Sequence, residues 1–205
     1  MLSQLLGLLH PMAMLTAQDF AVPGLITLAY VQLFDAFFLQ QVAAKEAAGG
    51  PQMARFDYSN KRWEMADRTL GNFIEQTPSF LIQLWAYALF ISAPGTLVGG
   101  AIYLSARCFF PLIWSYHGQW TPWVEMSTQP CYAVLSFWKA SLLCKLFTGA
   151  TLPLPQSLHM RIPALVGVHL AVFATSALMS LPLVLLTRLG FVGGKGVSTV
   201  RAKRR

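Results

Sequence analysis

The sequence is poor in charged residues. They make up 11% of its 205 residues, whereas soluble domains contain roughly 25%. Hydrophobic residues account for 55%, and many of them fall in long uninterrupted runs. This composition excludes a disordered chain, a collagen-like chain and most soluble enzymes. Together with the apolar runs it predicts an integral membrane protein.

Cysteine is also scarce. The three cysteines are Cys108, Cys131 and Cys144, and no Cys-x-x-Cys spacing occurs. An odd number of cysteines without that spacing predicts neither a disulfide framework nor a metal site. We therefore expect no metal cofactor.

Most of the positive charge flanks the apolar runs. The formal net charge is +7, and eleven of the fifteen basic residues lie between the first two runs, at the first residue of the second run, or after the last run. They are Lys45, Arg55, Lys61, Arg62 and Arg68, and then Arg188, Lys195, Arg201, Lys203, Arg204 and Arg205. Basic residues in these places are typical of contacts with membrane lipids. No basic motif indicates nucleic-acid binding.

Four apolar runs are long enough to cross about 30 Å of hydrocarbon. They cover residues 21–44, 68–92, 96–116 and 162–187. Lys139 and Lys145 interrupt a further apolar segment, which favours an interfacial or re-entrant helix there. We expect an all-α membrane bundle of four helices, with this additional helix between the third and fourth spans. It would be a multi-pass protein of the endoplasmic reticulum or a mitochondrial membrane, in an undetermined orientation.

The domain division follows from these runs. An apolar N-terminal extension covers 1–19, the membrane domain covers 20–190 with an insertion at 118–149, and a basic tail covers 191–205.

Polar side chains recur at helical spacing on two of the predicted spans. Arg68, Asn72 and Glu75 share one face of the second span, and Tyr103 and Arg107 share one face of the third. If the two faces meet, they form a polar pocket for an anionic or zwitterionic ligand. The alternative is that Arg68, Glu75 and Arg107 form a structural ion-pair network without a ligand.

Two isolated polar residues have simpler interpretations. Asp35 lies inside the first span, where we expect it to pair with Arg107 in preference to the alternative role of a proton relay. His169 lies inside the fourth span and is interpreted as a hydrogen-bonded packing residue.

The run RTLGNFIEQTPSFL at 68–81 resembles the signature of the MAPEG family, the membrane-associated proteins in eicosanoid and glutathione metabolism. It keeps the Arg, Asn, Glu, Pro and Phe-Leu of that pattern at the family's spacing. Tyr-Leu-Ser-Ala-Arg at 103–107 is similar to the family's third-helix motif. The resemblance covers about residues 20–116 and, more loosely, 151–187.

The resemblance implies a homotrimer of four-helix bundles that binds glutathione between neighbouring subunits. Arg68, Asn72 and Glu75 would hold the charged ends of glutathione, and Arg107 and Tyr103 would shape the pocket. An Arg near the start of the fourth helix stabilises the glutathione thiolate in the family, and Arg161 is the candidate here. A cation beside sulfur lowers its pKa and so raises the nucleophilic fraction.

The chain also departs from the family pattern. Gln76, Phe110 and Trp114 stand where the family has hydroxyl-bearing aromatic residues, and the segment 118–149 is extra. Two hypotheses therefore stay open. One is a glutathione-dependent transferase or peroxidase acting on lipophilic electrophiles. The other is a catalytically degenerate relative that serves as a structural or accessory subunit of a larger membrane complex.

Overall fold

The computed structural model describes residues 17–188 apart from 53, 55, 155 and 156. Five long α-helices make up nearly all of this part of the chain, and it contains no strand. The helices are α2 (Ala17–Ala48), α3 (Lys61–Tyr87), α4 (Gly95–His117), α5 (Pro122–Thr148) and α6 (Leu158–Arg188). Two short turns, η1 (Gly50–Gln52) and η2 (Ala88–Ser92), follow α2 and α3. Most of the predicted N-terminal extension and the whole basic tail lie outside the described residues.

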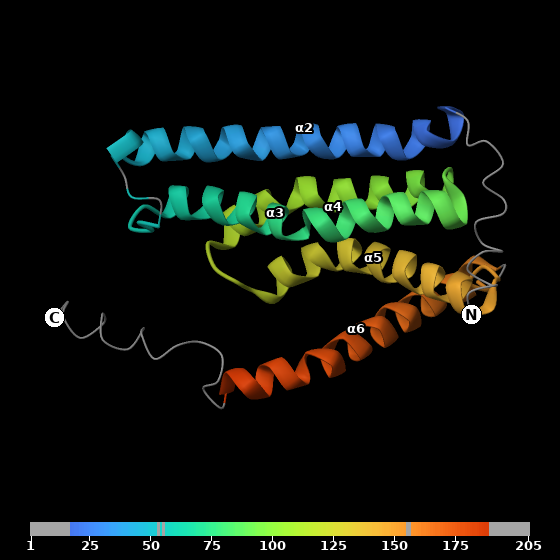
Figure 1. The fold of residues 1–205 in the computed structure, drawn as a ribbon. Coiled ribbons are helices and arrows are strands. Elements are labelled where there is room, and N and C mark those ends of the chain that lie inside the picture. Colours follow the sequence, from blue (N-terminus) through green and yellow to red (C-terminus); the bar gives the residue numbers. More distant parts are fainter. Residues whose placement is uncertain (1–16, 53, 55, 155–156, 189–205) are drawn as a thin grey trace.

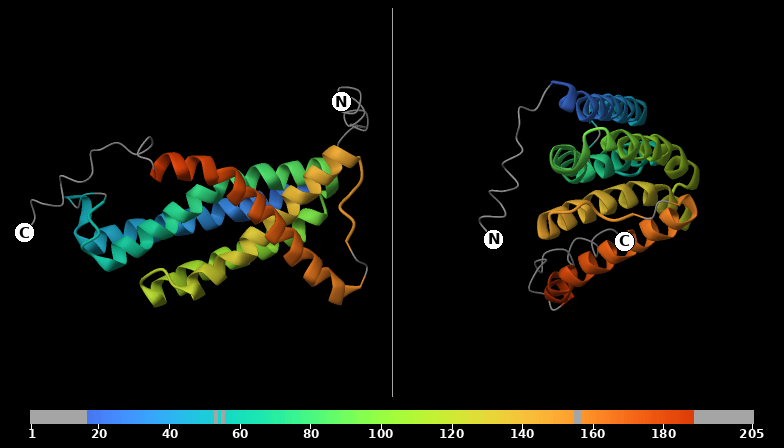
Figure 2. Two further views of the ribbon diagram at one scale, coloured as in Figure 1. Left: turned by 90° about the horizontal axis from the view of Figure 1, so that it is seen from below. Right: turned by 90° about the vertical axis from the view of Figure 1, so that its right-hand side faces the viewer.

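The helices stack in layers (Figure 2). The pair α3 and α4 forms the middle layer, with α2 packed on one side and α5 on the other. The last helix, α6, crosses the outside of α5 and contacts no other helix of the described chain. We expected residues 162–187 to be the fourth helix of the bundle. Instead, α5 takes the place beside α3 and α4, and α6 is peripheral.

The segment between the third and fourth predicted spans is one continuous helix of 27 residues. The Thr121 side chain caps the start of this helix by accepting a hydrogen bond from the Val124 N–H at 3.3 Å. The helix ends at Gly149, which adopts the left-handed conformation with a φ of 73°. Its buried face repeats every three to four residues: Val124, Thr128, Cys131, Leu135 and Trp138. It is thus a packed core helix rather than the interfacial or re-entrant segment that we expected.

The two lysines of α5 explain why this expectation failed. Lys139 is exposed, and Lys145 lies in the last turn, where its Nζ donates to the Gly149 carbonyl oxygen at 2.9 Å. Both charges are therefore off the buried face, and neither one prevents α5 from packing lengthwise against α4.

Three of the four predicted spans are confirmed by length and hydropathy. They are Asp19–Ala48, Gly95–His117 and His159–Leu186. The span predicted at 68–92 falls in the later part of α3 and in η2. The helix α3 does not meet the same criterion among the described residues, because charged, amide and hydroxyl side chains lower its hydropathy. At 27 residues, α3 is nevertheless about 40 Å long.

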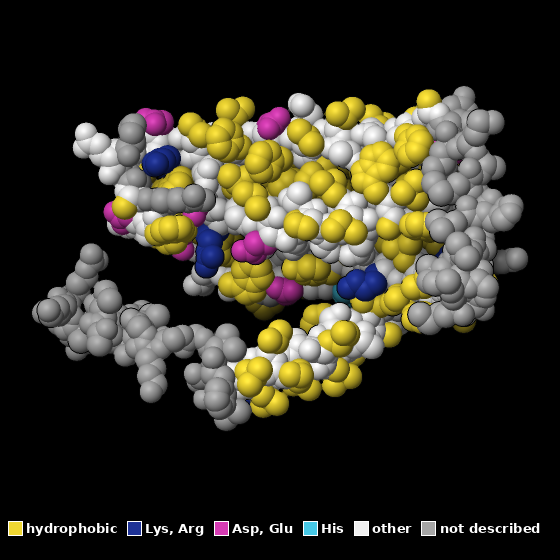
Figure 3. Space-filling view, in the orientation of Figure 1, with side chains coloured by type: hydrophobic (Ala, Val, Ile, Leu, Met, Phe, Trp, Pro, Cys, Tyr) yellow, Lys and Arg dark blue, Asp and Glu magenta, His cyan; other side chains and the backbone are white. Residues whose placement is uncertain are grey.

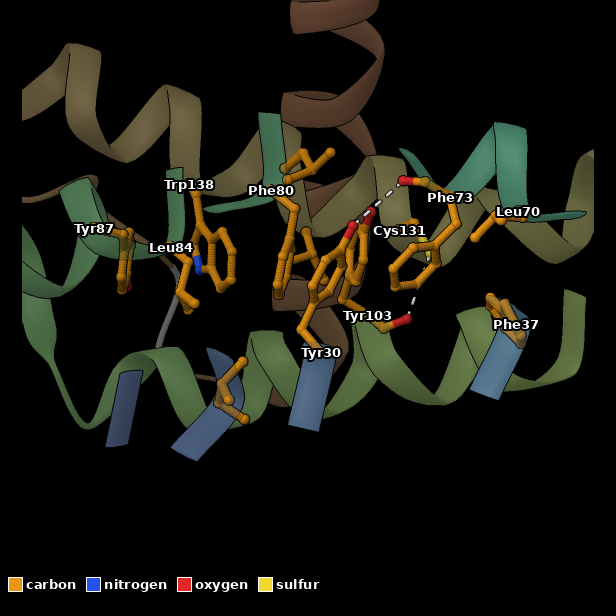
Figure 4. Close-up of a cluster of buried hydrophobic side chains, with 13 residues drawn as sticks. Tyr30, Phe37, Leu70, Phe73, Phe80, Leu84, Tyr87, Tyr103, Cys131 and Trp138 are labelled. Atoms are coloured by element: carbon orange, nitrogen blue, oxygen red, sulfur yellow. Dashed lines mark hydrogen bonds between the residues drawn. The ribbon is translucent and has the colours of Figure 1, made fainter. Parts of the chain in front are cut away.

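The core between the layers is mainly aromatic (Figure 4). Phe80 stacks on Tyr103 with ring centroids 4.0 Å apart, and Tyr30 stacks on Phe73 at 4.4 Å and on Phe80 at 4.8 Å. These rings come from α2, α3 and α4, so stacking holds the middle layer to the first one.

Two adjacent glycines let α4 approach both neighbours. A Cβ atom on Gly99 would lie 2.7 Å from Trp138 of α5, and one on Gly100 would lie 2.7 Å from Ile26 of α2. Real Cβ atoms do not approach other atoms so closely. The glycine pair therefore sets the spacing on both sides of the middle layer.

Candidate functional site

The polar face of α3 opens into a pocket of about 430 Å³. Arg68, Asn72 and Glu75 all line it, so the structure brings together the three second-span residues predicted from spacing. The opposite wall is aromatic and consists of Phe110 and Trp114 of α4 and Trp120 after it. Tyr58, Asp67 and Gly71 complete the lining. The helical residues of its lining come from positions 67–75 of α3 and from positions 110 and 114 of α4, so the pocket lies toward the end of the fold where α3 begins and α4 ends.

Arg107 lies behind this pocket as a buried cation, with its side chain 1% exposed. Its Nη1 donates to the Asn72 Oδ1 at 2.7 Å. Its guanidinium carbon lies 5.5 Å from the centre of the Tyr103 ring and 6.0 Å from that of Phe110. Its Nε and Nη2 have no hydrogen-bond partner among the residues that the structure describes. A buried guanidinium with two unused donors is suited to receive an anionic group.

The predicted pairing of Asp35 with Arg107 is wrong. Asp35 is exposed on α2, and Arg107 bonds to an amide oxygen instead of a carboxylate. The alternative ion-pair network is not formed either. Within the described residues the only ion pair is Lys61–Glu64 at 2.9 Å, and it lies on the first turn of α3. Arg68 and Glu75 are both exposed, as ligand-binding charges at the mouth of a pocket would be.

Tyr103 does not line the pocket but lies one layer deeper, fully buried. Its hydroxyl donates to the Gln76 Oε1 at 3.2 Å, and the Gln76 Nε2 donates to the Tyr132 hydroxyl at 3.1 Å. The amide of Gln76 thus links α3 to both α4 and α5. We noted Gln76 only as a departure from the family pattern, and Tyr132 carried no signal in the sequence.

A second polar contact that sequence reasoning missed closes the outer end of the pocket. Asp67 accepts hydrogen bonds from Tyr58, at 2.5 Å, and from Gln41, at 2.7 Å. The bond to the carboxylate, helped by some desolvation, raises the pKa of the Tyr58 hydroxyl above its usual value. Because Asp67 already accepts two hydrogen bonds, Glu75 is the carboxylate of the pocket that is available to a ligand.

Arg161 is not part of this pocket. It lies in the first turn of α6, exposed, at the end of the fold where α5 ends (Figure 1). The pocket lies toward the opposite end. The structure therefore separates Arg161 from Arg68, Asn72, Glu75 and Arg107 within one chain.

His169 is a hydrogen-bonded packing residue, as predicted. Its Nδ1 lies 3.0 Å from the Ser136 Oγ and its Nε2 lies 3.2 Å from the Gln129 Oε1. Both partners belong to α5, so these bonds join α6 to the rest of the fold.

Comparison with known proteins identifies a family. The model of the MAPEG family matches residues 20–138. The match covers α2, α3, α4 and α5 as far as Trp138, so it includes every residue of the pocket and excludes α6 with Arg161. No curated protein and no solved structure matches the chain.

Proposed function

The chain belongs to the MAPEG family, and from this premise we propose that it is a membrane-bound, glutathione-dependent transferase or peroxidase. In this proposal the pocket between α3 and α4 holds glutathione, and a lipophilic electrophile reaches the glutathione sulfur from the bilayer. The single observation that carries the proposal is the charge pattern of that pocket. One cation, two carboxylates and an amide line it, and a buried guanidinium donates to the amide. One of the carboxylates, Asp67, already accepts hydrogen bonds from Tyr58 and Gln41.

The chemistry of glutathione matches this pattern. The tripeptide has two carboxylates and one ammonium group, so its binding needs two cations and one anion at suitable distances. Arg68 supplies one cation and Glu75 supplies the anion at the pocket surface. Arg107 adds a second positive charge from behind Asn72, without lining the pocket. Asn72 lies between Arg68 and Glu75 along α3 and already accepts from Arg107. The volume of about 430 Å³ is within the usual range for small-ligand sites, about 300–1,000 Å³.

The aromatic wall supports the second substrate. Phe110 and Trp114 stack nearly parallel, with ring planes 7° apart, and Trp120 meets Trp114 edge-on at 5.8 Å. These rings offer an apolar surface beside a charged one. We propose that the electrophile lies against them while glutathione occupies the α3 side.

Transfer requires a thiolate, which a nearby cation stabilises. The family resemblance gives this role to Arg161. Its position argues against that assignment, even in a homotrimer. A rotation about the membrane normal keeps every residue at its own depth, so the Arg161 of a neighbouring subunit would also lie at the far end. We therefore assign thiolate stabilisation to Arg68 as well, because its guanidinium has five N–H donors and can serve a carboxylate and the sulfur together. Arg68 lines the pocket and is exposed to solvent.

We also propose a homotrimer in which the neighbouring subunit covers this pocket. The exposed positions of Arg68 and Glu75 on the outer surface of one chain support that arrangement. Glutathione would then lie between two subunits, as the family resemblance implies.

The test is a titration of glutathione into the detergent-purified full chain, followed by calorimetry and by the ultraviolet absorbance of the thiolate. Arg68→Ala and Glu75→Gln each remove a charged partner, and we expect roughly a tenfold or larger loss of affinity from each. Arg68→Ala should also abolish the thiolate band, whereas Arg161→Ala should keep it. If the band instead disappears only in Arg161→Ala, Arg161 is the activating residue. If neither variant weakens binding, the proposal fails.

The second candidate is a scaffold without chemistry, an accessory subunit of a larger membrane complex. One observation favours it: α6 lies outside the family match and leaves many apolar side chains exposed, among them Phe173, Leu178 and Met179. Native-size analysis in mild detergent distinguishes the two candidates. A hetero-complex would favour the scaffold, and recovery of a homotrimer alone would count against it.

A further inference from the structure

A groove separate from the glutathione pocket lies where α2 ends and α3 begins. Two cavities, of about 430 and 370 Å³, adjoin there and share Ala44, Lys61 and Arg62. We call them together the α2–α3 groove. None of its described lining residues belongs to the pocket that contains Arg68 and Glu75.

The lining of the α2–α3 groove has positive charge only. Lys61 and Arg62 are its charged residues, and no carboxylate is found among its described lining residues. Lys61 pairs with Glu64 nearby at 2.9 Å, whereas Arg62 has no ion-pair partner in the described part of the chain. The groove therefore differs from the pocket that contains Arg68, whose lining also holds two carboxylates. It is suited to an anion without a compensating ammonium group.

The same groove has an apolar wall and a polar rim. Ala44, Met65 and Ala66 form the wall, and Ser59 and Ser115 contribute hydroxyls. The first backbone N–H groups of α3 do not face an anion, because Asn60 Oδ1 accepts from those of residues 62 and 63 at 3.0 and 3.2 Å. An anion in the groove would consequently be held by the two basic side chains.

The surroundings of the groove suit an amphiphile. Leu39 and Val42 of α2 lie just before Ala44 along the chain and are 65% and 41% exposed. Figure 3 shows many apolar side chains along the visible face of α2, with both basic and acidic side chains toward the end where α3 begins. An apolar helix face that ends at a basic groove matches a molecule with an acyl chain and an anionic head.

We propose that the α2–α3 groove binds an anionic phospholipid, with its phosphate on Lys61 and Arg62 and its acyl chains along the exposed face of α2. The planar guanidinium of Arg62 can donate two parallel hydrogen bonds to phosphate oxygens, and Lys61 adds a point charge. The lipid would fix the junction between α2 and α3 at the membrane surface. The proposal does not depend on glutathione binding, because the two sites share no described lining residue.

The experiment uses the full chain, delipidated in non-ionic detergent, with phosphatidylglycerol and phosphatidylcholine added at equal concentration. Native mass spectrometry measures how much of each lipid the protein retains. We expect roughly a fivefold or larger preference for phosphatidylglycerol, because two basic residues near a membrane surface each favour an anionic headgroup. Exchange of both cations in Lys61→Gln/Arg62→Gln should abolish the preference, and Arg62→Lys should retain part of it.

The matched control exchanges two basic residues elsewhere, in Lys139→Gln/Lys145→Gln, and should keep the preference. Helix content by circular dichroism identifies a variant that fails to fold, and Arg62→Gln alone then replaces the double variant. Equal retention of both lipids by the natural chain would overturn the proposal. So would an undiminished preference in the folded groove variant. Displacement of the lipid by millimolar inorganic phosphate would show that the site recognises free phosphate and would also overturn it.

Discussion

Replacing Arg107 with methionine should weaken glutathione binding with little effect on stability. Methionine keeps most of the apolar length of the side chain and deletes its charge. Arg107 is 1% exposed and makes one hydrogen bond, to Asn72, while its Nε and Nη2 have no partner among the described residues. The consequences of the replacement for stability and for binding therefore have different origins.

The stability change is a difference between two effects of similar size. Losing the charge-assisted bond to Asn72 costs about 1.5–3 kcal/mol, and losing the contacts with the Tyr103 and Phe110 rings costs roughly 0.5–1 kcal/mol each. Removing two buried, unsatisfied donors offsets this by about 1–3 kcal/mol each. We expect the free energy of unfolding to change by less than about 2 kcal/mol. Breaking a buried ion pair would instead cost about 3–5 kcal/mol.

Thermal unfolding in detergent, followed by tryptophan fluorescence, measures the change in stability. Calorimetric titration of glutathione measures the change in binding. A change of 2 kcal/mol corresponds to about 4–8 °C in Tm for a chain of this size, and we expect a smaller shift than that. Glutathione affinity should fall by roughly tenfold or more. Arg188→Met, at the exposed end of α6, is the control and should change neither quantity. A loss of more than 3 kcal/mol, or unchanged glutathione affinity, would refute the reasoning.

The remaining predictions concern packing and pH. Gly100→Ala should lower stability by about 1–3 kcal/mol, because the added Cβ would lie 2.7 Å from Ile26. The control, Gly167→Ala, places its Cβ where nothing lies within 4 Å and should not lower stability. Equal losses of stability in thermal unfolding of the two variants would contradict this prediction. The Asp67 carboxylate holds the pKa of Tyr58 above its usual value, so the stability that this bond contributes is fully present below about pH 10 and is lost as pH rises through the raised value. Spectroscopic titration of tyrosinate, compared between the natural chain and Tyr58→Phe, should place Tyr58 above pH 10; ionisation at or below that pH would show that the bond is absent in solution.

Much of the candidate site could be predicted from local spacing. Arg68, Asn72 and Glu75 line one pocket because residues three and four apart share one face of a helix, and the sequence alone states that spacing. The sequence could not say which partner each charge meets. Arg107 bonds to Asn72 rather than to Asp35, because the rotation of α2 leaves Asp35 exposed on its outer side.

The contacts that reach across helices were the least predictable. Gln76 joins Tyr103 to Tyr132 over separations of 27 and 56 residues, and Tyr58 and Gln41 both reach Asp67. The bonds of Gln76 and the bond between Gln41 and Asp67 depend on how two helices are rotated and shifted against each other. Tyr58 lies before α3, so its bond depends on how the segment between α2 and α3 folds. Helical periodicity does not contain that information.

The sequence by itself determined that this is an α-helical membrane protein of the MAPEG family, because hydropathy, helical spacing and the motif at 68–81 are properties of short segments. Only the tertiary structure decided which helices pack together. It placed α5 beside α3 and α4, moved α6 to the outside, and separated Arg161 from the pocket. The physical reason is that an apolar helix can bury its surface against protein or against lipid at similar free energy. Close packing through Gly99, Gly100 and the aromatic core then determines which helix lies in the interior.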